Sequence, residues 1–245
     1  MSVEFCNVGK RVGRGNNSRW LFDDLNIRVE PGERVLILAP PKSGKSTLLR
    51  LLCGTDYPDR GTIERTSSVS WPLPQGDFLV AFSSVATNIR FLMRLYGVDD
   101  DDVLRRISDL AEISEFLNKR LADCPRFIKS RLVLALGVGL GFDVCIFDER
   151  AAAVDKEFKP RAIEILKSLG RDKALVLATS TPKEAADIFE TAFVLEEGRL
   201  TPFPDVNDAI KHYKALMVKN DDAEPDVPEA GPELVDEEFV LEVGI

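Results

Sequence analysis

Short apolar runs alternate with longer amphipathic stretches along residues 3–217 of this chain. The apolar runs have the length of buried strands, whereas the longer stretches repeat their apolar positions at the spacing of one helix face. We expect strands over residues 3–8, 25–29, 34–38, 69–71, 144–147, 174–178 and 192–196. We expect helices over residues 45–52, 86–96, 101–112, 130–140, 156–168, 182–190 and 206–217.

The order of these elements predicts an α/β fold with two kinds of sheet. The late strands are separated by helices, which favours right-handed crossovers and a parallel sheet. The first sixty residues have hairpin-like spacing and little helix, which indicates an antiparallel β layer beside the parallel core. Pro31-Gly32 and Glu197-Gly198 predict turns between strands.

Composition supports a folded protein of one or two domains. The chain has 245 residues, of which 44% are hydrophobic and 30% are charged, so it can bury a full core. Its longest apolar stretch, residues 132–142, is far shorter than the roughly 20 residues of a membrane-spanning helix. The first residues lack the basic start and apolar core of a secretory signal. We therefore expect a soluble, cytoplasmic protein.

Cysteine and histidine usage excludes several kinds of site. The four cysteines are scattered and form no C-x-x-C pair, which argues against a structural zinc site or a disulfide framework. His212 is the only histidine, so Ser-His-Asp hydrolysis and multi-histidine metal sites are both disfavoured.

The negative charge is concentrated at the C-terminal end. The net charge is −9, and residues 220–245 contain ten acidic residues and no Lys or Arg, so residues 1–219 carry a charge near +1. A nearly neutral body does not favour nucleic-acid binding. We expect residues 1–219 to form the folded domain and residues 220–245 to be a disordered acidic tail. Residues 239–243 are apolar enough to dock, but we favour a solvated tail.

The segment 34–50 carries the strongest chemical signal. An apolar strand runs into Gly44-Lys45-Ser46-Thr47 and an apolar helix follows, which is the layout of a phosphate-binding P-loop. Backbone amides at the helix start can point at a phosphate, Lys45 can reach the β- and γ-phosphates, and the Ser46 hydroxyl can ligate Mg²⁺. The expected cofactor-binding residues are Ala39, Pro40, Pro41, Lys42, Ser43, Gly44, Lys45, Ser46 and Thr47.

A second segment supports this interpretation. Residues 144–147 are apolar and end in the adjacent carboxylates Asp148 and Glu149. A buried parallel strand would deliver both at its carboxyl end, beside the P-loop. Asp148 would then hold Mg²⁺ through water, and Glu149 would polarise the attacking water as the catalytic residue. We therefore expect ATP and Mg²⁺ as cofactors.

Residues 2 to about 217 resemble the ATP-binding subunits of ABC transporters, in particular the branch that exports capsular polysaccharides and polyol phosphates. The motifs that carry the resemblance are residues 22–27, 31–33, 44–52, 58–63, 70–72, 88–91, 94–96 and 147–149. The resemblance implies a P-loop NTPase core with an antiparallel β layer and a helical subdomain at about residues 84–140. It also implies a homo- or heterodimer of such subunits on the cytoplasmic face of a membrane permease, with nucleotide between one P-loop and the other subunit's signature loop.

Several motifs of that family are altered here. The signature loop falls on residues 124–129, without its serine and glycine, and Phe127 would obstruct a γ-phosphate. The position of the family's glutamine falls on residues 79–81, and that of its switch histidine near Ser180. Val12 replaces the aromatic residue that stacks on adenine, with Trp20 as a nearby candidate. These changes predict retained nucleotide binding and impaired hydrolysis.

Three functions remain open at this point. The first is the ATP-binding subunit of an exporter of cell-surface polysaccharide, which hydrolysis stimulated by a membrane partner would favour. The second is a nucleotide-dependent regulatory or scaffold protein of ABC architecture, which tight binding without a permease would favour. The third is a small-molecule P-loop kinase, in which Arg126 and Arg131 would serve as lid arginines. The β layer argues against the kinase.

Overall fold

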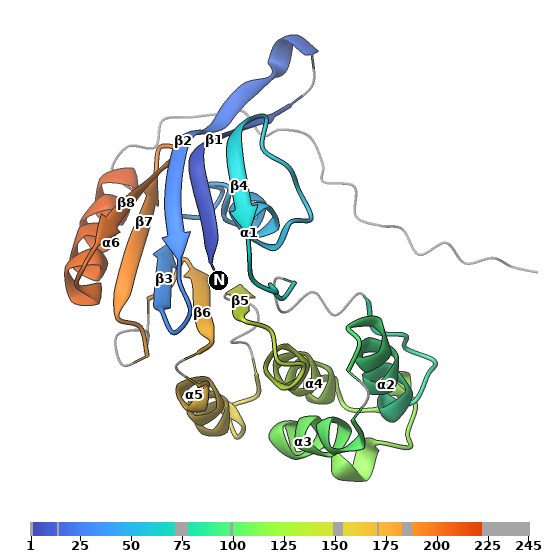
Figure 1. Cartoon of the computed structure of the whole chain (residues 1–245). Coiled ribbons are helices and arrows are strands. Elements are labelled where there is room, and N and C mark those ends of the chain that lie inside the picture. Colours follow the sequence, from blue (N-terminus) through green and yellow to red (C-terminus); the bar gives the residue numbers. More distant parts are fainter. Residues whose placement is uncertain are drawn as a thin grey trace, which may run out of the picture.

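The computed structural model describes residues 2–13, 15–71, 78–98, 100–148, 154–170, 172–182 and 188–221. These residues form a mixed α/β fold with a mainly parallel sheet, a smaller antiparallel sheet and a helical lobe below them (Figure 1). The α/β class, the antiparallel layer and the helical subdomain expected from the sequence are all present.

The larger sheet has the strand order β5-β6-β3-β7-β8. Its strands are β3 (Arg34–Leu38), β5 (Val144–Asp148), β6 (Ala174–Thr179), β7 (Thr191–Glu196) and β8 (Arg199–Phe203). The pairs β3–β6, β3–β7 and β5–β6 are parallel, whereas β8 runs antiparallel to β7. The helices that follow these strands are α1 (Lys45–Cys53), α5 (Lys159–Ser168) and α6 (Val206–Asp221).

The smaller sheet has the order β2-β1-β4, and both of its pairs are antiparallel. It consists of β1 (Val3–Val12), β2 (Arg19–Val29) and β4 (Arg60–Arg65), with a short 3₁₀ turn η1 (Gly15–Asn17) between β1 and β2. Its inner face packs on α1 and on one face of β3. Because side chains alternate along a strand, Val35 and Ile37 face this core while Leu36 and Leu38 face the core shared with the helical lobe.

The helical lobe contains α2 (Val85–Leu95), α3 (Asp101–Ala111) and α4 (Arg126–Gly139), with 3₁₀ turns η3 (Ser114–Phe116) and η4 (Leu121–Asp123). Polar caps start two of these helices: the Ser84 side chain accepts from the Thr87 amide, and that of Asp100 accepts from the Asp102 amide. The lobe packs against β5 through α4, whose end leads into the start of that strand (Figure 1).

The structure corrects several of the expected strands. The strands expected over 3–8 and 25–29 are longer, as β1 and β2. The edge strands β4 and β8 were not among the expected strand ranges, because β4 is mostly exposed and charged and β8, which follows the expected turn at Glu197-Gly198, contains Pro202. Residues 69–71 contribute only an isolated bridge from Val69 to Val144.

The helix starts also differ. The helix expected over 130–140 begins four residues earlier, at Arg126, and the one over 156–168 begins at Lys159. Helix α6 continues to Asp221, past the expected boundary at residue 219.

Of the helix expected over 182–190, residues 183–187 lie outside the described residues and 188–190 are not helical. Of the tail expected over 220–245, residues 222–245 also lie outside them.

None of the helices in the described ranges has the length and apolar character needed to cross a membrane.

Candidate functional site

The loop between β3 and α1 is held at both ends by backbone hydrogen bonds. The Ala39 amide donates to the Thr179 carbonyl at 3.0 Å, which anchors the start of the loop to β6. The Ser43 amide donates to the Pro40 carbonyl at 3.2 Å, and the Leu48 amide donates to the Gly44 carbonyl at 3.0 Å. The loop therefore turns sharply and delivers the N-terminus of α1 directly after the central strand.

Two left-handed residues shape this turn. Lys42 has φ 64° and Gly44 has φ 97°. A side chain at position 44 would also collide with β2, because an added Cβ would lie 2.8 Å from Phe22 Cζ and 2.9 Å from Leu21 Cδ2. Position 44 therefore requires glycine for both its backbone angle and its space. Residues in such conformations direct backbone N–H groups into a concave, anion-binding surface.

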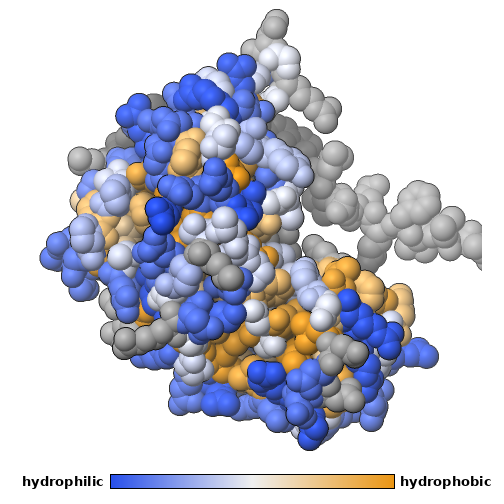
Figure 2. All heavy atoms as spheres, viewed as in Figure 1, coloured by the Kyte–Doolittle hydropathy of each residue, from blue (hydrophilic) through white to orange (hydrophobic). Residues whose placement is uncertain are grey.

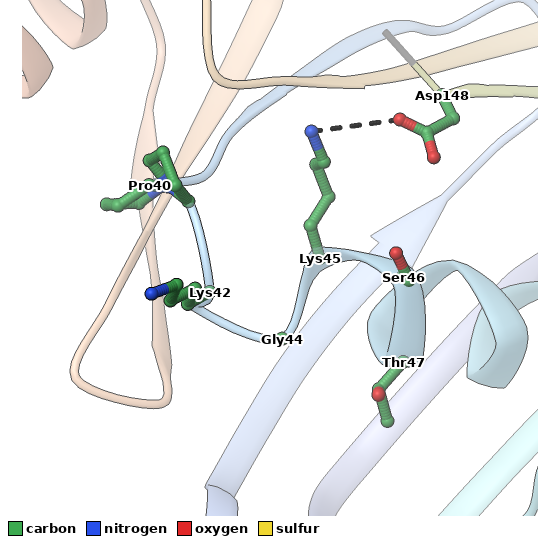
Figure 3. A pocket seen from close by; sticks show the side chains of 8 residues that line it. Pro40, Lys42, Gly44, Lys45, Ser46, Thr47 and Asp148 are labelled. Atoms are coloured by element: carbon green, nitrogen blue, oxygen red, sulfur yellow. Dashed lines mark ion pairs between the residues drawn. The ribbon is translucent and has the colours of Figure 1, made fainter. Parts of the chain in front are cut away.

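The loop encloses a pocket of about 430 Å³ (Figure 3). Its walls are Pro40, Pro41, Lys42, Gly44, Lys45, Ser46, Thr47 and Asp148. Lys45 Nζ lies 3.7 Å from Asp148 Oδ1 across this pocket, and both side chains are largely buried. Asp148 comes from the carboxyl end of β5, which reaches the loop because β5 and β3 both pair with β6.

The donor set of the pocket suits Mg²⁺. In the described ranges no three His, Cys, Asp or Glu side chains form a metal-holding group. The pocket offers instead one carboxylate, Asp148, and two hydroxyl residues, Ser46 and Thr47. Mg²⁺ is commonly held by one or two protein oxygens together with waters and phosphate oxygens, so these residues fit an ion that arrives with a nucleotide.

Most of the expected phosphate-site residues are brought together by the fold. The 430 Å³ pocket is lined by the expected residues except Ala39 and Ser43, which lie in the same loop. The Ser43 hydroxyl is buried and has no hydrogen-bond partner in the part of the chain that the structure describes. Glu149, expected to be catalytic, lies outside the described residues.

The start of α4 is built differently from the start of α1. Pro125 precedes the helix and no side chain caps it. Phe127, 37% exposed, covers the guanidinium of Arg131, whose Cζ lies 4.8 Å from its ring centre. The ring centre of Phe158 lies 4.6 Å from the same guanidinium carbon. The expected signature position is therefore occupied by a bulky, packed side chain.

Arg131 ties the helical lobe to the segment that follows β5. Its Nε and Nη2 each donate to one oxygen of Asp155 at 2.8 Å, and its Nη1 lies 3.6 Å from Glu112 Oε2. The hydrogen bonds from Arg131 lower the pKa of Asp155, and the same bonds raise the pKa of Arg131. This fully engaged, buried guanidinium does not serve as a kinase lid arginine.

The structure also shows the contacts at the positions of the family's glutamine, switch histidine and aromatic residue. Asn88 of α2 holds Val80 through both backbone groups, at 2.7 Å to the amide and 3.0 Å to the carbonyl. Ser180 follows β6, and its carbonyl accepts a hydrogen bond from Tyr213 of α6. The indole of Trp20 lies against Gly9, with the Arg11 guanidinium 4.4 Å above its ring centre. Trp20 is thus engaged as a packed surface residue.

Arg50, whose side chain contacts the expected phosphate-binding loop between β3 and α1, was not identified from the sequence. Arg50, one turn after Thr47 on α1, donates through Nη2 to Thr47 Oγ1 at 2.9 Å. The spacing of three residues on an expected helix was a signal for this contact, because such residues share a face.

Comparison with known proteins adds independent information. A profile of the ABC transporter family matches residues 22–152. The ATP-binding protein BexA of Haemophilus influenzae is 33% identical over 214 residues, which cover 86% of this chain and 97% of BexA. The capsule polysaccharide export ATP-binding protein CtrD of Neisseria meningitidis is 32% identical over 219 residues, which cover 88% of this chain and 99% of CtrD.

Solved structures share the fold at lower identity. The dimeric post-hydrolysis structure of the ATP-binding cassette MJ0796, bound to ADP and Pi, aligns with a TM-score of 0.72 and 18% identity. That alignment covers 82% of this chain and 98% of the cassette. The matched profile, the two relatives aligned over nearly their whole length and the shared fold lead to one conclusion: this chain belongs to the ABC transporter family.

Proposed function

We propose that this protein is the ATP-binding subunit of an ABC exporter of cell-surface polysaccharide and couples nucleotide binding to a membrane permease. The observation that carries the proposal is the pocket in which the phosphate loop, Lys45 and Asp148 converge. The substrate class rests on relatives named for capsule polysaccharide and polysialic acid transport, which this chain matches over nearly their whole length.

In this proposal the phosphate loop binds the triphosphate of ATP. The amides at the start of α1 and the Lys45 ammonium contact the β- and γ-phosphates, and Thr47 closes the loop at the helix. Ser46 and Asp148 hold Mg²⁺, which neutralises phosphate charge when bound. Glu149 polarises the attacking water. The roles of Ala39, Pro40, Pro41, Lys42, Ser43 and Gly44 are to shape the loop around the phosphates.

The helical lobe offers a surface for the permease. Hydrophobic side chains gather over this lobe on the face seen in Figure 2. Several large ones are strongly exposed, and four of them lie on or just before α2: Val80, Phe82, Phe91 and Leu95. Exposed apolar clusters of this kind mark protein contacts. The protein would then work as a dimer bound to the inner face of the cell membrane.

Binding of MgATP to the purified full-length protein tests the nucleotide site. Lys45→Ala removes the ammonium that faces the phosphates, so calorimetry should show a loss of ATP affinity of tenfold or more and little change for adenosine. Lys211→Ala is the control, because Lys211 is exposed on α6 and forms its ion pair with Asp208 of the same helix. Equal ATP affinity of the Lys45 variant and the wild type would refute the site.

Membrane association tests the exporter assignment. In cells that produce the protein, Phe91→Asp and Leu95→Asp should move it from the membrane fraction to the soluble fraction, whereas Arg105→Asp on α3 should not. ATP hydrolysis stimulated by a co-purified permease would support the exporter. Tight ATP binding by a protein that never associates with a permease would instead support the regulatory or scaffold alternative.

A further inference from the structure

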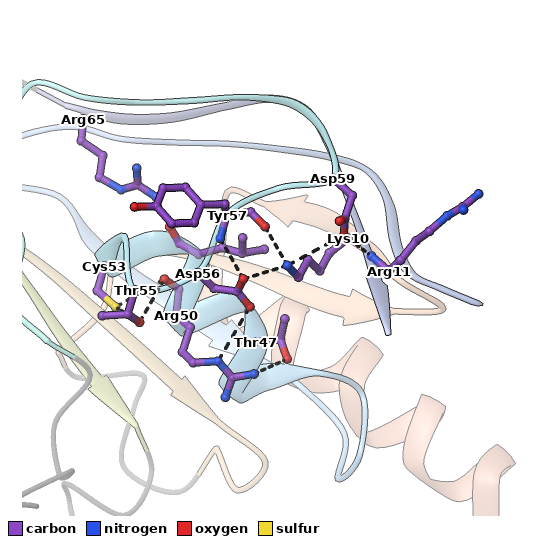
Figure 4. Close-up of polar contacts among 11 residues, drawn as sticks. Lys10, Arg11, Thr47, Arg50, Cys53, Thr55, Asp56, Tyr57, Asp59 and Arg65 are labelled. Atoms are coloured by element: carbon purple, nitrogen blue, oxygen red, sulfur yellow. Dashed lines mark hydrogen bonds and ion pairs between the residues drawn. The ribbon is translucent and has the colours of Figure 1, made fainter. Parts of the chain in front are cut away.

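Arg50 contacts the phosphate loop from within α1 (Figure 4). Side chains on a helix lean towards its N-terminus, so a long residue at position 50 covers the turn that contains position 47. Arg50 Nη2 donates to Thr47 Oγ1 at 2.9 Å. Thr47 is itself 8% exposed and lines the pocket beside Lys45 and Ser46. The contact therefore joins a residue outside the pocket to one of its walls.

The direction of this hydrogen bond determines what the Thr47 hydroxyl can do. A guanidinium only donates, whereas a hydroxyl has one proton to give and two lone pairs to accept with. The Thr47 oxygen must therefore accept from Arg50, and its proton is left for an acceptor. Phosphate oxygens are acceptors. The contact with Arg50 thus leaves the Thr47 hydroxyl able to donate to an anion in the loop. The guanidinium also places a positive charge next to Thr47.

Arg50 is itself held in place by the loop that follows α1. Its Nε lies 3.9 Å from Asp56 Oδ2, and Asp56 Oδ1 accepts from Lys10 Nζ of β1 at 2.7 Å (Figure 4). Burial raises the pKa of Asp56, but the hydrogen bonds from Lys10 and from the Tyr57 amide outweigh it, and the pKa is lowered overall. Asp56 is therefore ionised at neutral pH, and its carboxylate is available as the ion-pair partner of Arg50.

This network differs from the surface ion pairs of the same protein. The side chains of Lys10 and Asp56 are 15% and 26% exposed, and that of Arg50 is 43% exposed. In the Arg105–Asp102 pair of α3, by comparison, both side chains are more than 70% exposed. Partial burial of Lys10 and Asp56 limits solvent screening and fixes the position of the carboxylate, and Arg50 joins it from a more exposed position at 3.9 Å.

We propose that Arg50 is a positioning residue for nucleotide binding: it orients the Thr47 hydroxyl towards the bound phosphates and is held there by Asp56 and Lys10. The proposal rests on the proposed nucleotide site and names a determinant of its affinity that lies outside the phosphate loop. Arg50 acts through Thr47, so its effect must depend on the Thr47 hydroxyl.

A double-mutant cycle on the full-length protein tests this dependence, with the dissociation constant of MgATP as the readout. Arg50→Ala should weaken binding about fivefold to tenfold when Thr47 is present, the size expected for one ordinary hydrogen bond. Combined with Thr47→Val, which removes the hydroxyl but keeps the shape, Arg50→Ala should change the constant by less than about twofold. Asp56→Asn should have a smaller effect in the same direction.

Arg65→Ala is the matched control. Arg65 also binds α1, but it donates to the carbonyls of Leu51 and Leu52 at the far end of the helix. Its loss should lower the melting temperature and leave MgATP binding unchanged. Should Arg50→Ala fail to fold, Arg50→Lys keeps the charge but not the forked guanidinium, and it should show the same dependence on Thr47 with about a threefold effect.

The outcomes separate the two proposals. If the wild-type protein binds no MgATP, the nucleotide site and the role of Arg50 are both wrong. If Lys45→Ala abolishes binding but Arg50→Ala and Arg50→Lys bind as the wild type does, only the role of Arg50 is wrong. If the Arg50 variants weaken binding equally with and without the Thr47 hydroxyl, Arg50 acts through general charge or folding, and the positioning role is refuted.

Discussion

The phosphate loop and the start of α4 are both short loops that lead into a helix, and they differ in the residues of the first turn. At α1 the helix begins after Gly44, at φ 97°, and its next residues include the small hydroxyl side chains Ser46 and Thr47. At α4 it begins after Pro125, and its second residue, Phe127, lies over Arg131. Both helix starts carry the positive end of a helix dipole.

The difference indicates that a helix N-terminus suits the proposed phosphate site only where its backbone amides can be approached. Gly44 and the hydroxyl residues leave the amides of α1 facing a pocket that also contains Lys45 and Asp148. At α4 the proline lacks an N–H, and the phenylalanine is fixed by a cation–π contact. If the protein forms the nucleotide sandwich of its family, the two halves of that sandwich are chemically unequal.

The largest effect is expected from a substitution in the loop that leads into α1. Gly44→Ala places a methyl group against Phe22 and forces alanine into a left-handed conformation. Together these should cost about 3 kcal/mol of unfolding free energy and abolish nucleotide binding. Gly141→Ala is the control, because its φ is also positive, at +82°, but nothing lies within 4 Å of the added Cβ. Equal losses in urea denaturation would show that the contact with Phe22 is not tight.

The second largest effect is expected when the contact between Arg131 of α4 and Asp155 is removed. Arg131→Met removes both hydrogen bonds to Asp155 and leaves that carboxylate partly buried. We expect a loss of about 2 kcal/mol of unfolding free energy, less than for a fully buried pair. Arg105→Met, in an exposed pair on α3, should cost less than about 0.5 kcal/mol. A Met variant at 131 as stable as the wild type would show that Arg131 does not fix the α4 start.

Acid should weaken the contact between Arg131 and Asp155. The hydrogen bonds from Arg131 lower the pKa of Asp155 in the folded protein, so the unfolded chain binds its proton at higher pH. The stabilisation is complete above the unfolded pKa, near 4, and is lost as pH falls through the lower folded pKa. Unfolding free energy measured from pH 6 to pH 2.5 should fall less steeply in Arg131→Met than in the wild type. Parallel curves would contradict this.

The unequal halves also predict a small effect on catalysis. We expect little ATP turnover by the isolated protein, because the start of α4 and the loop at Ser180 lack the usual γ-phosphate groups. Glu149→Gln should then change the rate less than about threefold, since catalysis is limited elsewhere. A robust basal activity that Glu149→Gln abolishes would show that other residues, such as Ser180 or Arg126, supply the missing groups.

The smallest effect is expected at the C-terminal end. Deleting residues 222–245, just after α6, should leave the melting temperature and ATP affinity nearly unchanged and raise the isoelectric point. The segment is rich in acidic residues and poor in large apolar ones. A loss of several degrees in melting temperature would show that residues 239–243 pack on the body and that our expectation of a disordered tail is wrong.

Most of the parallel sheet could be predicted, and much of the antiparallel sheet could not. Buried strands such as β3 and β5 are continuous apolar runs, so the sequence marks them directly. The β4 strand has only Ile63 as a large apolar residue, and its strand conformation comes from pairing with β1. The edge strand β8 contains a proline and is defined by its pairing with β7.

The sequence by itself determined the phosphate loop, because strand, glycine, lysine and helix are consecutive and their chemistry is local. Only the tertiary structure decided which distant groups reach that loop or the start of α4. Lys10, Asp56 and Arg50 meet because β1 packs across α1, and Arg131 meets Asp155 because α4 lies beneath β5. Contacts between residues far apart in sequence depend on how whole elements pack, and local patterns do not contain that information.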